Sequence, residues 1–262
     1  MQNNSKACPI IRHMHSRKTR ILWSGITGRT GVEAVAITQE DEATEIVAGV
    51  CRSKSAEHYN YDQLDAIKEN FDVIVDFSHT DSFDQVLNVA LKCRKPLIIG
   101  TAGLSEQQER RIEEASHIIP VFKGGNFRFE VKKFIDAVVR YARVSDEDLL
   151  LVETHYKTKK IPSETAKVIA KRVLDETGKK LQIQSFLKYD ELINDWRLGN
   201  LHCRVQGFRQ LAEDVLDIAR LMVDKRADGV YDLDRLWSQI EDRSSNFIKQ
   251  QNGSTQAGII ET

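Results

Sequence analysis

One stretch of this 262-residue chain carries a histidine, several lysines and a helix start close together. The apolar run Asp148–His155 predicts a strand that ends on His155, a cationic loop with Lys159 follows, and Pro162-Ser163 opens a predicted helix. A histidine can transfer a proton near neutral pH, and a lysine beside a helix N-terminus can bind an anion. The alternative interpretation is a surface loop with a capped helix and an ordinary histidine.

A second stretch, Gly25-Ile26-Thr27-Gly28-Arg29-Thr30-Gly31, lies between the first predicted strand and the first predicted helix. Glycines there allow a tight turn and a close approach of the backbone to a pyrophosphate, whose charge meets N–H groups at the helix start. The spacing differs from the commoner Gly-x-Gly-x-x-Gly, and a mere tight turn is the alternative. The position directly after the first strand favours a nucleotide site.

The residues after the second predicted strand bear on which nucleotide this is. An acidic residue about 20 positions after the glycines binds the ribose of NAD in many proteins. That position is Cys51 here, and Arg52 and Lys54 follow it. An uncharged residue followed by cations suits the 2′-phosphate of NADPH better than the bare hydroxyl of NADH, although NADH stays possible. A solvated basic loop is the alternative.

The elements that must position these residues alternate between strand and helix up to about residue 125, which predicts parallel strands joined by helical crossovers. Strands are expected at 20–24, 45–50, 72–77, 97–100 and 118–122, and helices at 30–39, 82–93 and 106–115. Later helices at 131–141, 163–175, 208–224 and 233–240 accompany strands at 148–155, 181–187 and 201–206. The predicted fold class is α/β, with a Rossmann-type doubly wound parallel sheet and a second α/β domain containing a mixed sheet.

Composition excludes several classes of protein. The formal net charge is −1, which argues against nucleic acid as a partner, and no apolar run approaches the roughly 18 residues of a membrane span. Four separated cysteines without Cys-x-x-Cys fit neither a disulfide scaffold nor a zinc site, so a cytoplasmic location and no metal are expected. Residues 1–18 are expected to be a disordered lead-in and residues 243–262 a polar tail.

Several landmarks, in order along the chain, resemble the dihydrodipicolinate reductase (4-hydroxy-tetrahydrodipicolinate reductase) family of the diaminopimelate route of lysine biosynthesis. The glycine stretch is similar to that family's Gly-x-x-Gly-Arg-Met-Gly, with Thr30 in place of methionine. The other landmarks are Val75-Asp76-Phe77-Ser78, Gly100-Thr101-Ala102-Gly103, Asn126-Phe127, Glu153-Thr154-His155 and Pro162-Ser163-x-Thr165-Ala166. The resemblance covers roughly residues 20 to 175.

This resemblance implies an oxidoreductase that transfers hydride from NADPH, or NADH, to a cyclic unsaturated imine. It implies a dinucleotide-binding domain at 19–126, which also receives the helical region 208–241, and a substrate-binding and oligomerisation domain at 127–207, with a homotetramer as the assembly. The expected cofactor-binding residues are Gly25, Thr27, Gly28, Arg29, Thr30, Gly31, Arg52, Phe77, Gly100, Thr101, Asn126 and Phe127. His155 falls on the family's proton donor and Lys159 on its essential lysine, and the other expected substrate contacts are Tyr156, Ser163, Glu164 and Thr165.

The second half departs from the family pattern. Tyr156 stands where a second histidine is usual, Arg128-Phe129-Glu130 stands where Ser-x-Gly is usual, and no Gly-x-His ending is recognisable between Leu187 and Arg204. Glu164 replaces a glycine, and its charge would repel a substrate carboxylate by about 1–4 kcal/mol unless a cation such as Arg128 intervenes. Weak activity on 4-hydroxy-tetrahydrodipicolinate is therefore expected. A divergent paralogue that reduces another imine or carbonyl, and a non-catalytic NADPH-binding protein, stay open as alternatives.

Overall fold

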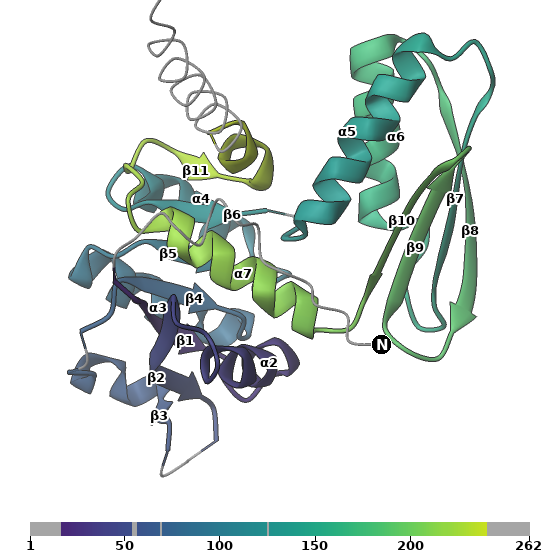
Figure 1. Cartoon of the computed structure of the whole chain (residues 1–262). Helices are drawn as coiled ribbons and strands as arrows, with labels where there is room; N and C mark the ends of the chain where they lie inside the picture. Colours follow the sequence, from purple (N-terminus) through teal and green to yellow (C-terminus); the bar gives the residue numbers. More distant parts are fainter. Residues whose placement is uncertain (1–16, 54–56, 69, 125, 240–262) are drawn as a thin grey trace, which may run out of the picture.

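The larger half of the molecule is built on a sheet of seven parallel strands, in the order β11-β6-β5-β4-β1-β2-β3 (Figure 1). Its strands are β1 (Thr19–Ser24), β2 (Thr44–Cys51), β3 (Tyr59–Asn60), β4 (Val73–Asp76), β5 (Leu97–Ile99), β6 (Val121–Lys123) and β11 (Val230–Tyr231). The structure, a computed structural model, describes residues 17–53, 57–68, 70–124 and 126–239. Most of the predicted lead-in, the predicted tail and Lys54 lie outside the described residues.

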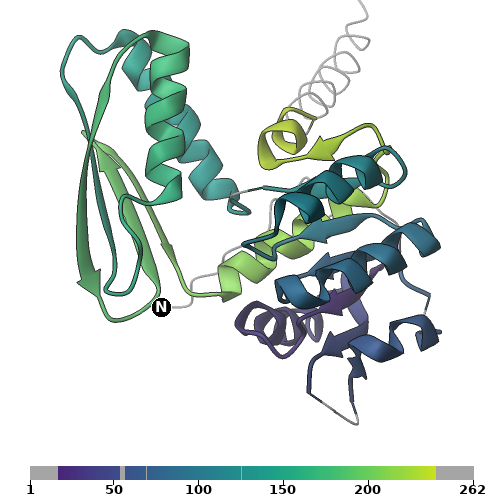
Figure 2. The same ribbon diagram turned by 180° about the vertical axis from the view of Figure 1, so that it is seen from behind.

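Helices cover both faces of this sheet because its central strands carry apolar side chains on both sides. Ile21 and Trp23 of β1 pack in the same core cluster as α7 (Arg209–Met222), next to α2 (Arg29–Thr38). Leu22 of β1 packs in a second cluster with α3 (Thr80–Cys93), α4 (Glu106–Ser116) and the 3₁₀ helix η1 (Tyr61–Ala66), on the face that is turned to the viewer in Figure 2. Successive residues of a strand point to opposite faces, which yields a three-layer fold.

The order of the strands reverses between β1 and β4. From β1 the chain proceeds through α2 to β2 and β3 on one side, whereas β4 is followed by β5 and β6 on the other side. In an open parallel sheet, ligands bind in the crevice outside the carboxyl ends of the strands at such a switch point. The segments that follow Ser24 and Asp76 begin at this crevice, and the Phe77 N–H donates a hydrogen bond of 3.0 Å to the Ser24 carbonyl.

The smaller half is a four-stranded mixed sheet, in the order β10-β9-β7-β8, with two helices on one face. Its elements are α5 (Phe129–Val144), β7 (Leu149–Tyr156), α6 (Glu164–Thr177), β8 (Leu181–Tyr189), β9 (Ile193–Leu198) and β10 (Leu201–Gln206). Strand β8 runs parallel to β7, and β9 runs antiparallel to both β7 and β10. Leu149 and Leu151 of β7 pack with Ala166 and Ile169 of α6 in a third core cluster, so alternate residues of β7 face the helices.

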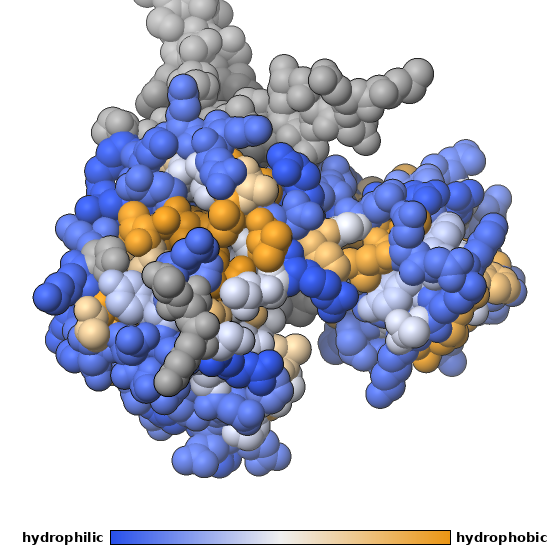
Figure 3. All heavy atoms as spheres, turned by 90° about the horizontal axis from the view of Figure 1, so that it is seen from below, coloured by the Kyte–Doolittle hydropathy of each residue, from blue (hydrophilic) through white to orange (hydrophobic). Residues whose placement is uncertain are grey.

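The chain passes between the two halves twice. Residues 124–128 lead from β6 to α5, and residues 207–208 lead from β10 back to α7, which packs on the larger sheet (Figure 1). The space-filling view shows the result as two lobes, with apolar side chains gathered on the larger lobe and where the two lobes meet (Figure 3). No helix of the described residues is long and apolar enough to cross a membrane.

The predicted fold class is confirmed, with differences in single elements. Strand β9 was not expected, because Ile193–Leu198 mixes apolar and polar residues and lacks a β-branched run. The strand expected at 118–122 begins at Val121 instead, because the N–H groups of Ile118 and Ile119 bond the Ala115 carbonyl and close α4. Ile118 is accordingly 52% exposed. The short edge strands β3 and β11 carry only two residues each and offer no periodicity to detect.

Candidate active site between the two halves

The loop after β1 is shaped by its glycines. Gly25 has φ +80, and a Cβ atom there would lie 2.2 Å from the Phe77 carbonyl oxygen. A Cβ atom on Gly31 would lie 2.3 Å from the Ile26 carbonyl oxygen. The Gly25 and Ile26 N–H groups bond the Val50 carbonyl at 2.9 and 3.1 Å, which holds the loop against β2. The glycines are therefore required by the loop itself.

The start of α2 fits the pyrophosphate of a dinucleotide. Gly28 occupies the N-cap, no side chain caps the helix, and its first turn contains no acidic residue. Thr27, Gly28 and Arg29 are exposed, whereas Thr30 is buried. The Arg29 guanidinium lies 4.4 Å from the centre of the Phe208 ring. Uncapped N–H groups and the positive end of the helix dipole favour an anion at this position.

At the carboxyl end of β2, Cys51 is buried and its thiol donates a 3.1 Å hydrogen bond to the Ser53 carbonyl. The next side chain, Arg52, is exposed, and its carbonyl accepts a 2.8 Å hydrogen bond from the Asn60 amide. Because β2 is the neighbour of β1, Arg52 lies at the same edge of the sheet as the glycine loop. Among the described residues at the end of β2 there is no carboxylate, so the exposed charged group there is the Arg52 guanidinium.

The segments after β4 and β5 are tied together by a buried carboxylate, Asp76. Its oxygens accept hydrogen bonds from Ser78 Oγ at 2.6 Å and from Thr101 Oγ1 at 2.7 Å. Burial raises the pKa of Asp76, against these hydrogen bonds. A Cβ atom on Gly100 would lie 2.4 Å from the Phe77 ring, so Gly100 permits this ring to lie flat on the loop. These bonds fix both loops at the crevice.

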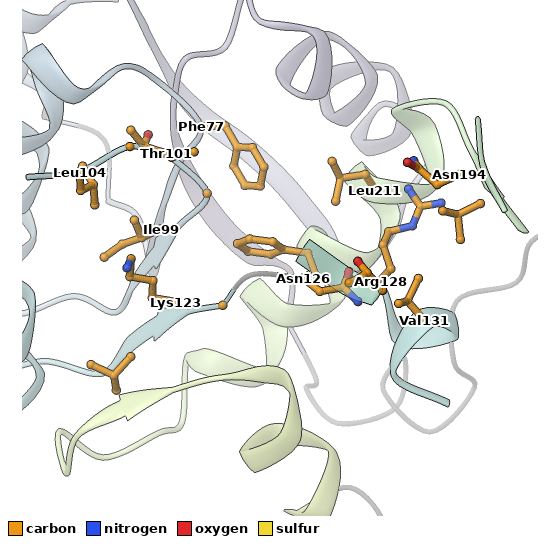
Figure 4. Close-up of a pocket in the computed structure, with 18 of the residues that line it drawn as sticks. Phe77, Ile99, Thr101, Leu104, Lys123, Asn126, Arg128, Val131, Asn194 and Leu211 are labelled. Carbon is orange, nitrogen blue, oxygen red and sulfur yellow. The ribbon is translucent and has the colours of Figure 1, made fainter. Parts of the chain in front are cut away.

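A cavity of about 800 Å³ lies between these loops and the smaller half (Figure 4). The larger half contributes mainly loop residues, namely Phe77, Gly100, Thr101, Lys123, Asn126 and Phe127. The smaller half and the two crossings contribute Arg128, Val131, Lys159, Thr165, Asn194, Trp196, Val205 and Gly207. The expected residues Phe77, Gly100, Thr101, Asn126, Phe127, Lys159 and Thr165 are thus brought together, although 165 and 77 are far apart in the chain.

The start of α6 forms part of the cavity wall. Ser163 is its N-cap, and Ser163 Oγ accepts a 3.1 Å hydrogen bond from the Ala166 N–H. Lys159 lies with its ammonium group 5.8 Å from the centre of the Tyr156 ring. The structure does not bring Glu164 into the cavity, because its side chain is 80% exposed and bonds Lys167 at 2.7 Å. The first turn of a helix directs successive side chains to different sides, so Thr165 faces the cavity and Glu164 faces solvent.

His155 is fully buried and is not among the residues that line the cavity. Its Nε2 lies 2.8 Å from Glu153 Oε2, and its ring meets the Trp196 ring edge to face at 5.4 Å between centres. Glu153 also accepts hydrogen bonds from the Ser163 N–H and hydroxyl and from Ser185 Oγ. Burial alone would raise the pKa of Glu153, but hydrogen bonds from His155, Ser163 and Ser185 outweigh it and lower the pKa to about 2.

Three residues that line the cavity were not predicted from the sequence as site residues: Arg128, Asn194 and Trp196. Arg128 was considered only as a cation that could offset Glu164, and Asn194 and Trp196 were not considered. All three lie beyond the motif positions, and β9, which carries two of them, has no sequence signal. Knowledge of the pairing of β7 with β9, which places Asn194 opposite His155 and Trp196 opposite Glu153, would have identified Asn194 and Trp196.

Comparisons with known proteins agree with this geometry. Residues 19–127 match the family described as dihydrodipicolinate reductase, N-terminus. The 4-hydroxy-tetrahydrodipicolinate reductase of Pseudoalteromonas atlantica is 31% identical over an alignment of 180 residues, which covers 62% of this chain and 67% of that protein. The chain belongs to the dihydrodipicolinate reductase family.

Another member of the dihydrodipicolinate reductase family matches over a similar share of the chain. The 4-hydroxy-tetrahydrodipicolinate reductase of Caldanaerobacter subterraneus subsp. tengcongensis is 34% identical over 154 residues, 58% of this chain and 61% of that protein. The chain thus spans about three fifths of the length of the first curated relatives that it matches.

The fold extends further than the sequence similarity. A dipicolinate-bound dihydrodipicolinate reductase from Paenisporosarcina sp. TG-14 has a TM-score of 0.67 and 16% identity, and the match covers 82% of this chain and 97% of that one. The family match ends at residue 127, directly before Arg128.

Proposed function

We propose that the chain is an NAD(P)H-dependent reductase that transfers hydride to a cyclic unsaturated imine of the 4-hydroxy-tetrahydrodipicolinate type. The observation that carries this proposal is the cavity beside the switch point, beyond the carboxyl ends of β4, β5 and β6, which is lined both by Phe77 and Thr101 and by Lys159 of the smaller half. The nicotinamide cofactor supplies the hydride. The glycine loop and the start of α2 bind its pyrophosphate, and the loops at Phe77 and Thr101 orient the nicotinamide end and exclude water.

On the substrate side, Lys159 and the start of α6 at Thr165 bind a carboxylate of the substrate. His155 supplies the proton that accompanies hydride transfer, while the Glu153 carboxylate on Nε2 stabilises the imidazolium and fixes the ring. Nδ1 has no hydrogen-bond partner among the described residues, so it is the ring atom available to a substrate. Because the ring is fully buried and does not line the cavity, proton transfer from His155 requires a rearrangement that brings Nδ1 to the substrate.

NADPH is the preferred cofactor in this proposal. Arg52 is exposed at the end of β2, and Cys51 offers no carboxylate to the ribose hydroxyls. A guanidinium pairs well with a phosphate dianion, and a carboxylate is needed to favour the bare ribose. Arg52→Ala should therefore raise the KM for NADPH about ten-fold and leave the KM for NADH nearly unchanged. Equal losses with both cofactors would remove Arg52 from cofactor selection.

A divergent paralogue that reduces another imine or carbonyl is the second candidate. Strand β9 carries Asn194-Asp195-Trp196, which bring a bulky ring and an amide to the cavity. Arg128 adds a buried cation to the same wall. These side chains change the shape and charge of the substrate space while the cofactor loops keep the family pattern. The substrate of this lineage can thus differ although the reaction class stays the same.

The test is steady-state reduction of freshly generated 4-hydroxy-tetrahydrodipicolinate by the purified chain with NADPH, together with calorimetric titration of NADPH. We expect NADPH binding and measurable turnover. Lys159→Met should lower kcat/KM by about 10–100-fold because a charge-assisted bond to the substrate is lost. Lys160→Met is the matched control, because Lys160 is exposed and lies outside the cavity. NADPH binding without turnover on this substrate, but with turnover on other cyclic imines, would favour the paralogue.

Assembly and location belong to the same proposal. Phe186, which is 46% exposed, and Leu150 lie on strands β8 and β7 with no helix over them. Exposed apolar side chains on a sheet face favour contact with a second copy of the chain, so we infer a homo-oligomer. The described cysteines Cys51, Cys93 and Cys203 are free thiols, which fits a reducing cytoplasm. Sedimentation velocity of the purified chain measures the oligomeric state.

A further inference from the structure

The wall of the cavity formed by the smaller half contains buried polar atoms that lack partners. Among the described residues, Arg128 Nε, Asn194 Oδ1 and His155 Nδ1 are buried without a hydrogen bond. His155 and Asn194 are direct neighbours across β7 and β9, and Arg128 and Asn194 both line the cavity. Leaving a buried polar atom without a partner destabilises the fold, so three of them in one region indicate that a ligand completes this wall.

The Arg128 side chain is held in place by two hydrogen bonds, but most of its N–H donors have no acceptor in the described part of the chain. The residue is 8% exposed and precedes α5 as its N-cap. Its Nη2 donates to Gln210 Oε1 at 2.6 Å, and its Nη1 reaches the Gly207 carbonyl at 3.5 Å. A guanidinium carries five N–H donors in one plane, so most of them remain without an acceptor among the described residues. Figure 4 shows the Arg128 side chain extending along the cavity toward Asn194.

Burial lowers the pKa of Arg128 and outweighs the attraction of three carboxylates that act on its charge, Asp214, Glu130 and Glu213. Asp214 Oδ2 lies 3.4 Å from Arg128 Nε, but the pair forms no hydrogen bond and both atoms lack other partners. Burial raises the pKa of Asp214 to about 8, against the attraction of Arg128. Asp214 is therefore mainly protonated at neutral pH, while an arginine stays charged. A buried cation beside a mostly neutral acid favours an anionic ligand.

Asn194 is the second polar side chain of this cavity wall beside Arg128. Neither end of its side-chain amide has a hydrogen-bond partner among the described residues, and its Oδ1 is buried. The side chain points into the cavity from β9, on the same sheet face as His155. An amide can turn its NH₂ group toward an acceptor, since the two ends differ little in shape. A planar carboxylate can meet the guanidinium with both oxygens and the amide with one.

We propose that Arg128 and Asn194 form a subsite that binds a carboxylate of the substrate, separate from the anion site at Lys159 and the start of α6. This inference rests on the proposed function, because it assigns the second anionic group of a substrate reduced in this cavity. It explains why an arginine is buried where the two halves meet. One acid group of a dicarboxylate substrate then lies at each of the two sites.

The test compares two probes by calorimetry, pyridine-2,6-dicarboxylate and pyridine-2-carboxylate, each titrated into the full chain with saturating NADPH. The unmodified chain should bind the dicarboxylate at least ten-fold more tightly than the monocarboxylate. Arg128→Met should reduce that preference to within about two-fold and leave the Kd for NADPH unchanged. Arg128→Lys should retain part of the preference, because it keeps the charge and loses the planar fork.

Two further variants keep the test decisive if Arg128→Met folds poorly. Asn194→Ala should weaken dicarboxylate binding about five-fold or more without removing any charge. Arg140→Met is the matched control, since it removes an exposed arginine from the same helix α5 outside the cavity. Circular dichroism and thermal melting of each variant report whether it is folded.

The outcomes separate this subsite from the proposed function. Equal binding of both probes by the unmodified chain, or an unchanged preference in both Arg128→Met and Asn194→Ala, overturns the subsite. A loss of NADPH affinity in Arg128→Met that parallels the loss of dicarboxylate binding overturns it as well, because Arg128 would then serve the cofactor. A preference that depends on Arg128, in a chain that shows no reductase turnover, supports the subsite and rejects the proposed function.

Discussion

The two halves of the molecule treat their buried polar groups differently. At the cofactor crevice, the buried Asp76 carboxylate accepts hydrogen bonds from Ser78 and Thr101. Backbone N–H groups of the glycine loop bond to backbone carbonyls, as Gly25 does to Val50. On the facing wall, Arg128 Nε, His155 Nδ1 and Asn194 Oδ1 have no partner among the described residues. The other two such atoms are Trp23 Nε1, on β1 of the larger half, and Asp214 Oδ2, on α7 beside Arg128, so the contrast concerns the two walls of the cavity.

This difference follows from what each half has to do. A loop that receives a common cofactor can be specified by backbone sterics, which tolerate little change. A wall that receives a particular substrate must present side chains whose partners arrive with the ligand. The family match covers residues 19–127 and ends directly before Arg128, the first of the three unpartnered side chains of the facing wall.

The largest effect is expected for His155, whose role in the substrate half is proton transfer. His155→Gln should lower kcat about 10²–10⁴-fold, the usual contribution of a general acid, while the Kd for NADPH stays the same. His202→Gln is the matched control. His202 lies on β10, two strands from β7 in the same sheet, and its Nε2 likewise lies 3.1 Å from a carboxylate oxygen, Asp195 Oδ2. If His155→Gln only lowers the melting temperature and leaves kcat unchanged, His155 is a packing residue beneath Trp196.

Backbone sterics in the cofactor half are tested by comparing two glycines with positive φ. Gly25→Ala places a Cβ atom 2.2 Å from the Phe77 carbonyl oxygen, whereas a Cβ atom on Gly178 meets nothing within 4 Å. Gly178→Ala should cost about 1–2 kcal/mol of unfolding free energy, the cost of the left-handed conformation alone. Gly25→Ala should cost about 3 kcal/mol more, or prevent folding. Urea unfolding measures both, and equal costs would contradict the steric account of the loop.

Acid should weaken the substrate half through Glu153. Its pKa is lowered from an ordinary 4.5 to about 2 in the folded chain, so the unfolded chain binds more protons between these values. The stabilisation is complete above about pH 4.5 and is lost as the pH falls toward 2, up to about 3 kcal/mol in total. Glu153→Gln should thus have a lower free energy of unfolding than the unmodified chain at pH 7. The difference between the two free energies, measured by urea unfolding, should be smaller at pH 3.

Asp72 in the cofactor half serves as the reference for this measurement. Burial raises its pKa, but hydrogen bonds from Arg20 and Arg17 outweigh burial and lower it to about 2. Asp72 destabilises both the Glu153→Gln variant and the unmodified chain in acid by the same amount. Its effect therefore cancels in the difference between their free energies of unfolding. A gap between Glu153→Gln and the unmodified chain that does not change with pH would show that Glu153 stabilises the fold without being ionised.

The smallest effect is expected for Glu164, although the sequence alone suggested a large one. The side chain points to solvent and bonds Lys167, and its pKa is lowered by that lysine. Glu164→Gln should change kcat/KM for 4-hydroxy-tetrahydrodipicolinate less than about two-fold, because exposed charges are well screened. A gain of several-fold would mean that Glu164 faces the bound substrate.

The sequence by itself determined the alternation of strands and helices, the loop at Gly25–Gly31 and the cap at Ser163. These features depend on residues close together in the chain, and periodicity, glycine spacing and cap chemistry report such local preferences. The division into domains at residue 126 stays a prediction of the same kind.

The tertiary structure alone decided which of these residues meet. The burial of His155 beside Trp196 and the approach of Arg128 to Asn194 depend on long-range packing. Glu164 pairs with Lys167 within α6, but only the packing of α6 decides that this side of the helix faces solvent. Strand β9 pairs with β7 from about 40 residues further along the chain, and the resulting contacts leave no local pattern in the sequence. The cofactor loop is therefore readable in the sequence, and the wall that would select the substrate is readable only once the two halves are folded against each other.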